Sequence, residues 1–174
     1  MEPDTDNLGL ATFDSRHFRG ALSRFATGVT VVTGENGDGC FVGITVNSFN
    51  SVSLVPPLVL WSLATCSSSL SIFSKSSHYV INVLASDQRA LAVRFASKVA
   101  SRFEGVEVTL SPNGLPILAG ASVWFECRNR SQYLEGDHVI FVGEVTRLGL
   151  STRPGLIFQN GEFLESFPRS ASTK

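Results

Sequence analysis

The chain has 174 residues, of which 43% are apolar, and a formal net charge of −1. This length and apolar content fit a single domain with one sizeable core. The 14 basic and 15 acidic residues are spread along the sequence, so it has no basic stripe of the kind that binds nucleic acid. We therefore expect one globular domain and no nucleic-acid partner.

The cysteines and the chain ends indicate the compartment. Cys40, Cys66 and Cys127 form no CxxC pair and are odd in number, which argues against a zinc ribbon or a disulfide framework. The acidic start lacks the pattern of a signal peptide, and no apolar run approaches the roughly 20 residues of a membrane span. We expect a cytoplasmic protein without membrane contact, with tails at 1–13 and 168–174 around a domain over 14–167.

The first elements in chain order are a helix and a hairpin. A helix is expected from about Ser15 to Ala26, because Asp14 suits the N-cap and Phe18, Leu22 and Phe25 share one face. Residues 29–33 and 40–46 have a strand pattern on either side of GENGDG (34–39). A dinucleotide-binding loop lies between a strand and a helix, whereas a strand follows here. GENGDG is therefore interpreted as a hairpin turn.

Later elements are mostly strands. Strand patterns cover 58–63, 79–84, 122–134, 138–150 and 155–164, and helices are expected at 67–74 and 87–97. The two long strands over 122–150 meet at Gly136–Asp137 and form a hairpin. Many antiparallel strands with few helices predict a mainly β barrel rather than a parallel Rossmann sheet.

Two polar clusters follow strands. GITVNSFNSVSLVPPL (43–58) changes from a strand into hydroxyl and amide side chains, and SLATCSSS (62–69) opens an expected helix, whose free N–H groups attract phosphate. Either cluster alone can be a surface loop. Together they predict convergence on one phosphorylated ligand. Phe49, inside the first cluster, is the aromatic expected to stack on a flat cofactor, and the core is assigned Phe18, Phe25, Phe95, Phe125 and Phe141.

His138 follows the Gly136–Asp137 turn at the start of a strand. Such a histidine is either a half-exposed turn residue or a group that binds substrate at a pocket mouth, and the residues alone leave both open. No HExxH motif accompanies His17 or His78, so no metal is expected. The absence of a GxSxG elbow and of a Cys–His pair disfavours a hydrolase.

Six ordered segments give the sequence a family resemblance. It resembles the flavin reductase-like, FMN-binding split-barrel family, and is similar to the short-chain NAD(P)H:flavin oxidoreductase components of two-component flavin monooxygenases. The resemblance covers about residues 16 to 165, and the segments are FRGALSRFATGVTVVTG (18–34), GITVNSFNSVSLVPPLVL (43–60), YVINVLASDQRALAVRFA (79–96), RFEGV (102–106), LPILAGASVWFEC (115–127) and GDHVIFVGEV (136–145).

The resemblance implies a fold and an activity. These are an antiparallel split barrel, a homodimer with FMN or FAD near its interface, NADH or NADPH as hydride donor, and a separate monooxygenase that uses the reduced flavin. It also implies flavin-binding positions, which are Thr45, Val46, Asn47, Ser48, Phe49, Ser51, Val52, Cys66, Ser67, Ser68, Ser69, Ile72, Phe73, Asn82, Leu84 and Ala85. The positions it implies near the nicotinamide are His138, Asn160 and Gly161, with His138 the candidate catalytic residue.

Two other functional classes stay open at this point, because a fold does not fix a function. One is a split-barrel carrier or sensor that binds flavin without catalysis, and the other is a ligand-binding barrel without flavin. The residues do not distinguish FMN from FAD or NADH from NADPH.

Overall fold

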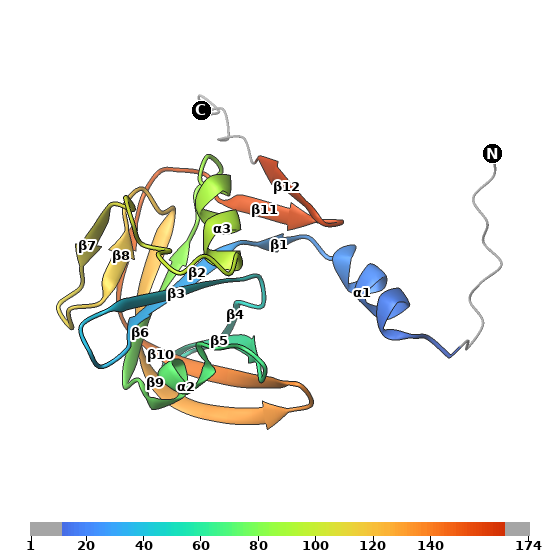
Figure 1. Cartoon of the computed structure of the whole chain (residues 1–174), viewed down its shortest axis with the longest axis horizontal. Helices are drawn as coiled ribbons and strands as arrows, with labels where there is room; N and C mark the ends of the chain where they lie inside the picture. Colours follow the sequence, from blue (N-terminus) through green and yellow to red (C-terminus); the bar gives the residue numbers. More distant parts are fainter. Residues whose placement is uncertain (1–11, 166–174) are drawn as a thin grey trace.

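The computed structural model describes residues 12–165, and this part of the chain has three helices. Figure 1 shows the strands curled into a barrel-like body. The predicted tails lie outside the described residues, apart from residues 12–13. The helices are Ser15–Ser23 (α1), Leu70–Lys75 (α2) and Arg89–Ala96 (α3). The strands are Thr27–Gly28 (β1), Thr30–Glu35 (β2), Phe41–Val46 (β3), Asn50–Leu54 (β4), Pro57–Ala64 (β5), His78–Val83 (β6), Val108–Leu110 (β7), Pro116–Leu118 (β8), Val123–Glu135 (β9), His138–Leu150 (β10), Leu156–Gln159 (β11) and Glu162–Glu165 (β12).

The main sheet confirms the predicted antiparallel barrel. Its seven strands run in the order β3-β2-β6-β9-β10-β5-β4, while β1-β11-β12 and β7-β8 form two smaller sheets. The edge strands β3 and β4 are not paired with each other, so the barrel is split along this line. Residues 47–49 bridge the split, and the Ser48 hydroxyl accepts a hydrogen bond from Ser62 N on β5 at 2.9 Å.

Both predicted turns are confirmed. β9 and β10 pair from His138–Glu135 to Leu150–Val123 around the turn at Gly136, whose φ of 58° suits glycine. At 36–40, the side-chain oxygen of Asn36 accepts hydrogen bonds from the N–H groups of Asp38 and Cys40 at 3.0 and 3.2 Å. The glycine-rich segment therefore connects β2 to β3 as a hairpin turn.

Apolar side chains fill the barrel and the space under α3. Inside the barrel, Trp61 stacks on Phe141 with ring centroids 4.5 Å apart. Under α3, the fully buried Phe95 packs with Val31 and Leu118. This confirms Phe95 and Phe141 as core residues. Phe125 is partly buried against the barrel core.

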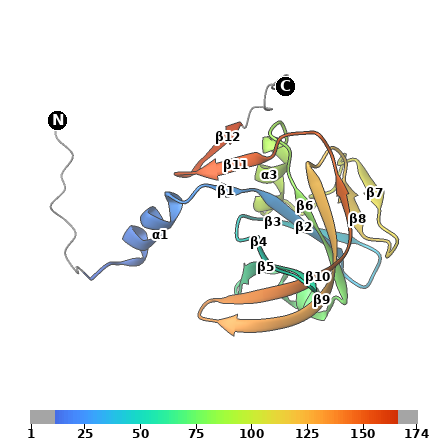
Figure 2. The same ribbon diagram turned by 180° about the vertical axis from the view of Figure 1, so that it is seen from behind.

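The N-terminal helix departs from the prediction. The Asp14 carboxylate accepts a hydrogen bond from His17 N at 2.7 Å, as an N-cap does, but α1 ends at Ser23 rather than Ala26. Figures 1 and 2 show α1 standing away from the barrel. Phe18 and Phe25 are 51% and 73% exposed, so their assignment to the core of this chain is wrong.

Two other boundaries also differ. The helix predicted to start at Ser67 begins at Leu70, because Ser67 to Ser69 form a tight turn in which Leu70 N donates to Ser67 O at 3.1 Å. The second half of the polar loop predicted over 47–53 belongs to the edge strand β4, which pairs with β5.

Candidate functional site

A cavity of about 1060 Å³ lies between the end of β5, the strand β3 and the loop that follows α3. We call it the serine cavity. One wall is the turn over 66–69 with Ile72 of α2, and β3 supplies residues 41–43. The opposite wall is the loop over 98–104. Five predicted site residues, Cys66, the serines at 67, 68 and 69, and Ile72, therefore lie together, as the sequence indicated.

The serine wall is fixed by backbone hydrogen bonds. Ser67 N donates to Ala64 O at 3.0 Å at the end of β5. The Ser67 hydroxyl accepts a hydrogen bond from Ser69 N at 3.3 Å. α2 has only six residues, so anion binding here depends on the hydroxyl groups and on nearby cations rather than on the helix N-terminus invoked from the sequence.

The opposite wall supplies the cations, which the sequence analysis missed. Arg102 donates from Nε and Nη2 to Ser97 O at 3.0 and 2.6 Å, and from Nη1 to Gly43 O at 2.9 Å. It therefore ties the loop to β3. Lys98 is exposed and has no side-chain partner within residues 12–165. In the sequence, about thirty residues separate these cations from the serines. The segment RFEGV (102–106), which contains Arg102, was the only quoted segment that includes one of them.

The lining suits a phosphorylated ligand with a planar part. Hydroxyl groups and an ammonium group such as that of Lys98 suit phosphate oxygens, and Glu104 is the one acidic residue of the lining. Phe41 and Phe103 meet edge to face at 5.7 Å and give the cavity an apolar side. Its volume lies at the upper limit of the size range of small-molecule sites.

The predicted isoalloxazine loop lies at the other end of β3 and is outside the serine cavity. The Thr45 hydroxyl donates to Ala92 O at 2.7 Å, and the Ser48 hydroxyl is bonded to Ser62. Phe49 stacks on Phe125 with centroids 5.7 Å apart. Asn47 is exposed with its amide unpaired among the described residues. Contact with flavin stays a prediction for this loop, including Val46, Ser51 and Val52.

Four predicted flavin contacts have side chains that are buried in this structure, so their contact with flavin stays a prediction. Phe73 is fully buried and packs edge to face on Trp61. Both amide atoms of Asn82 are used within the chain, since Nδ2 donates to Val31 O at 3.1 Å and Oδ1 accepts from Leu118 N at 2.9 Å. Leu84 and Ala85 are 0% and 1% exposed. In this structure these side chains take part in the packing and hydrogen bonding of the fold.

His138 lies at the tip of the β9–β10 hairpin and is 45% exposed. Its Nδ1 is 2.7 Å from Asp137 Oδ1, and the hydrogen bond from His138 lowers the pKa of Asp137. Thr65 N donates to Asp137 O at 2.8 Å, so the hairpin tip is fixed beside the segment that enters the serine turn. His138 itself does not line the serine cavity.

The β11–β12 turn lies at a separate cavity. Asn160 and Gly161 line a space of about 450 Å³ beside α1. Asn160 N donates to Ser23 O at 2.8 Å, which fixes the turn against the end of α1. The sequence did not predict that α1 would take part in a cavity.

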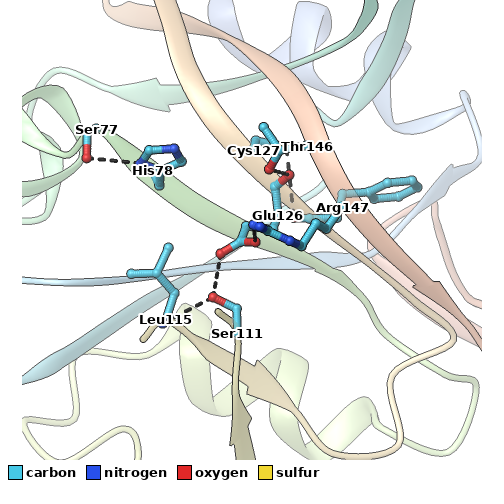
Figure 3. Close-up of polar contacts among 9 residues, drawn as sticks. Ser77, His78, Ser111, Leu115, Glu126, Cys127, Thr146 and Arg147 are labelled. Atoms are coloured by element: carbon cyan, nitrogen blue, oxygen red, sulfur yellow. Dashed lines mark hydrogen bonds and ion pairs between the residues drawn. The ribbon is translucent and has the colours of Figure 1, made fainter. Parts of the chain in front are cut away.

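A buried carboxylate lies apart from these cavities. Figure 3 shows Ser111 and Arg147 pointing toward Glu126, whose oxygens they contact at 2.5 and 2.9 Å. Burial raises the pKa of Glu126, but the hydrogen bonds from Ser111 and Arg147 outweigh this and lower it overall. The adjacent Cys127 is buried, and desolvation raises its pKa to about 12. This cluster joins β7–β8 to the barrel.

Two features are absent from residues 12–165. No group of three or more His, Cys, Asp or Glu side chains there is arranged to hold a metal ion. None of the helices in that range has the length and apolar character to cross a bilayer.

Comparisons with known proteins identify the family of the chain. The sequence profile of the family described as "Flavin reductase like domain" matches residues 22–165. The chain is similar to "FMN reductase (NADH) SmoA" of Agrobacterium fabrum, with 45% identity over 150 residues, 86% of this chain and 85% of that protein. It is also similar to the reductase component of a flavin-dependent trigonelline monooxygenase from Acinetobacter baylyi, with 38% identity over 158 residues, 91% of this chain and 50% of that protein.

A solved structure is also similar. The NADH:FAD oxidoreductase SgcE6 of Streptomyces globisporus, in complex with NAD and FAD fragments, has a TM-score of 0.85 and 34% identity, covering 92% of this chain and 99% of that one.

Proposed function

The chain belongs to the flavin reductase like domain family, and from this premise we propose that it is an NAD(P)H:flavin oxidoreductase. It transfers a hydride from NADH or NADPH to FMN or FAD. The observation that carries the proposal is the serine cavity, in which hydroxyl groups and cations from distant segments line one space. A flavin phosphate is the group these side chains fit.

The protein's part in the reaction is binding and orientation. Flavin, when bound, supplies the acceptor for the hydride. Ser67, Ser68 and Lys98 bind the phosphate, and Arg102 keeps the loop in place through its bonds to Ser97 O and Gly43 O. Asn47, beyond β3, offers an unpaired amide to the ring. This fixed geometry brings the reacting rings together, which accounts for much of the rate in such reactions.

Lys98 gives the sharpest test of the phosphate assignment. Lys98→Ala removes a cation that has no partner within the described chain, so the fold is unaffected. We expect a Kd for FMN raised by roughly two- to five-fold, the size of an exposed charge contact, and an unchanged Kd for riboflavin, which lacks the phosphate. Lys75→Ala, a lysine that lines a different cavity on α2, is the control.

Fluorescence titration measures both affinities. Equal losses for FMN and riboflavin would show that Lys98 does not contact a phosphate, and so would equal effects of the two lysine variants.

The reduced flavin passes to a partner monooxygenase. The relatives include reductase components of such enzymes, among them the trigonelline monooxygenase reductase and the reductase subunit HsaB of Rhodococcus jostii. A purified monooxygenase that shows turnover only when this protein, NADH and flavin are present identifies the partner.

We place the protein in the cytoplasm, where NADH is available, and the folded domain over residues 14–167.

A second copy of the chain covers α1. Phe18 and Leu22 of α1, and Phe25 just beyond its end, are more than half exposed, and an apolar stripe of this kind packs against another surface. Phe18→Asp should convert the homodimer to a monomer in light-scattering measurements, whereas Arg24→Asp should not. A wild-type protein that is monomeric at micromolar concentration contradicts the homodimer.

The second candidate is a flavin carrier or sensor without catalysis. Its supporting observation is that His138 does not line the serine cavity. NADH oxidation, followed by absorbance with FMN or FAD added, separates the two. A carrier binds flavin and leaves NADH unchanged.

A further inference from the structure

We propose that Arg16 and Arg19 of α1 bind the pyrophosphate of the pyridine dinucleotide, in the cavity between α1 and the β11–β12 turn. This inference rests on the proposed reductase function and assigns a binding site within it. We call this space of about 450 Å³ the arginine cavity.

The charges of the arginine cavity point to an anion. Arg16 and Arg19 both line it, and none of its lining residues is acidic. Neither guanidinium has a hydrogen-bond or ion-pair partner within residues 12–165. The other two cavities each contain a carboxylate, Glu35 in one and Glu104 in the other. The arginine cavity is therefore the most cationic of the three.

The orientation of α1 is unusual for an amphipathic helix. At 100° per residue, Ser15, Arg16, Arg19 and Ser23 share one face, and the apolar stripe of Phe18 and its neighbours lies on another. The polar face is the one turned toward the rest of its own chain, where it lines the cavity. A helix that packs only for stability turns its apolar face inward.

The wall of the arginine cavity opposite α1 is formed by Phe158 and the β11–β12 turn and suits the ribose next to the pyrophosphate. Phe158 lines the cavity and packs against Phe163 with centroids 5.1 Å apart. Asn160 adopts a left-handed φ of 52° and Gly161 one of 81°, so the turn is tight. The hydrogen bond from Asn160 N to Ser23 O holds this wall at a fixed distance from the arginines.

Size and geometry favour the pyrophosphate over a single phosphate. Two guanidiniums three residues apart bind oxygens on two neighbouring phosphates through paired N–H groups. The volume of about 450 Å³ accommodates a pyrophosphate and a ribose. The flavin phosphate is assigned to the serine cavity, which shares no residue with this one.

The test compares hydride donors with and without phosphate. Arg16→Ala and Arg19→Ala should each raise the KM for NADH and for NADPH by roughly five- to ten-fold, the effect of losing one typical hydrogen bond at an exposed position. The KM for N-benzyl dihydronicotinamide, which has no phosphate, should not change. Arg19→Lys should restore part of the loss. Arg24→Ala, at the end of the same helix and outside the lining, is the control.

A binding measurement tests the site without turnover. ADP-ribose, titrated by calorimetry, should bind the wild-type protein and the Arg24 variant more tightly than the Arg16 and Arg19 variants. An equal rise in KM for the benzyl compound would overturn the proposal, as would an effect limited to NADPH, which would indicate its 2′-phosphate. If the wild-type protein fails to reduce flavin with NADH, with NADPH and with the benzyl compound, the proposed function itself fails.

Discussion

Replacement of Gly43 by alanine tests how the fold positions the site. A Cβ at this position would lie 2.6 Å from Phe95 Cε1 and 3.3 Å from Phe103 Cζ. Phe95 is fully buried and has little room to move, so α3 and the loop after it must shift. Overpacking of this kind costs about 1 to 3 kcal/mol, which lowers Tm by roughly 2 to 12 °C in a domain of this size.

The same change reaches the serine cavity. Gly43 lines it, and Gly43 O accepts the hydrogen bond from Arg102. Gly43→Ala should therefore also raise the Kd for FMN, and Phe95→Leu in the same chain should recover part of the stability. Urea denaturation and fluorescence titration measure the two effects. Gly28→Ala is the control, because a Cβ there meets nothing within 4 Å. Equal stability of the two alanine variants would refute the packing argument.

Three further predictions concern other sites. His138→Ala should raise the KM for NADH or slow hydride transfer while leaving flavin affinity nearly intact, and unchanged steady-state constants would remove the residue from the site. Arg147→Met should raise the pKa of Glu126. The lowered folded pKa of Glu126 gives stability that is present above its usual value of 4.5 and is lost as pH falls, so acid unfolding followed by circular dichroism should begin at higher pH in the variant. Asn47→Ala should weaken flavin binding without loss of stability, whereas Ser48→Ala should cost about 1 kcal/mol of stability through the hydrogen bonds to Ser62. Flavin titration and denaturation of both variants measure these effects, and the opposite pattern would contradict the two roles.

The strand framework was predictable from local pattern. Alternating and continuous apolar runs identified β2, β3, β5, β6, β9 and β10, and the Gly136–Asp137 turn identified the long hairpin. The helix limits were less accurate. The apolar periodicity correctly predicted a helix at α1. It could not predict whether the apolar side chains pack inside the same chain, and in the described chain Phe18 and Phe25 are exposed.

The site was predictable in part. Three adjacent serines in one turn are a local signal, and the structure places them in a cavity. The cations facing them are about thirty residues away and meet them only through the fold. Conversely, the polar Asn82 resembled a ligand contact in the sequence, and only the structure shows that Val31, Thr33 and Leu118 use all its hydrogen-bonding groups.

Anaerobic reduction of FMN by NADH, followed by the loss of flavin absorbance, tests the central claim most directly. Catalytic amounts of the wild-type protein should reduce a large excess of FMN, and Lys98→Ala should do so with a higher KM for FMN and an unchanged KM for riboflavin. Flavin that stays oxidised in the presence of the protein and either NADH or NADPH would contradict the account.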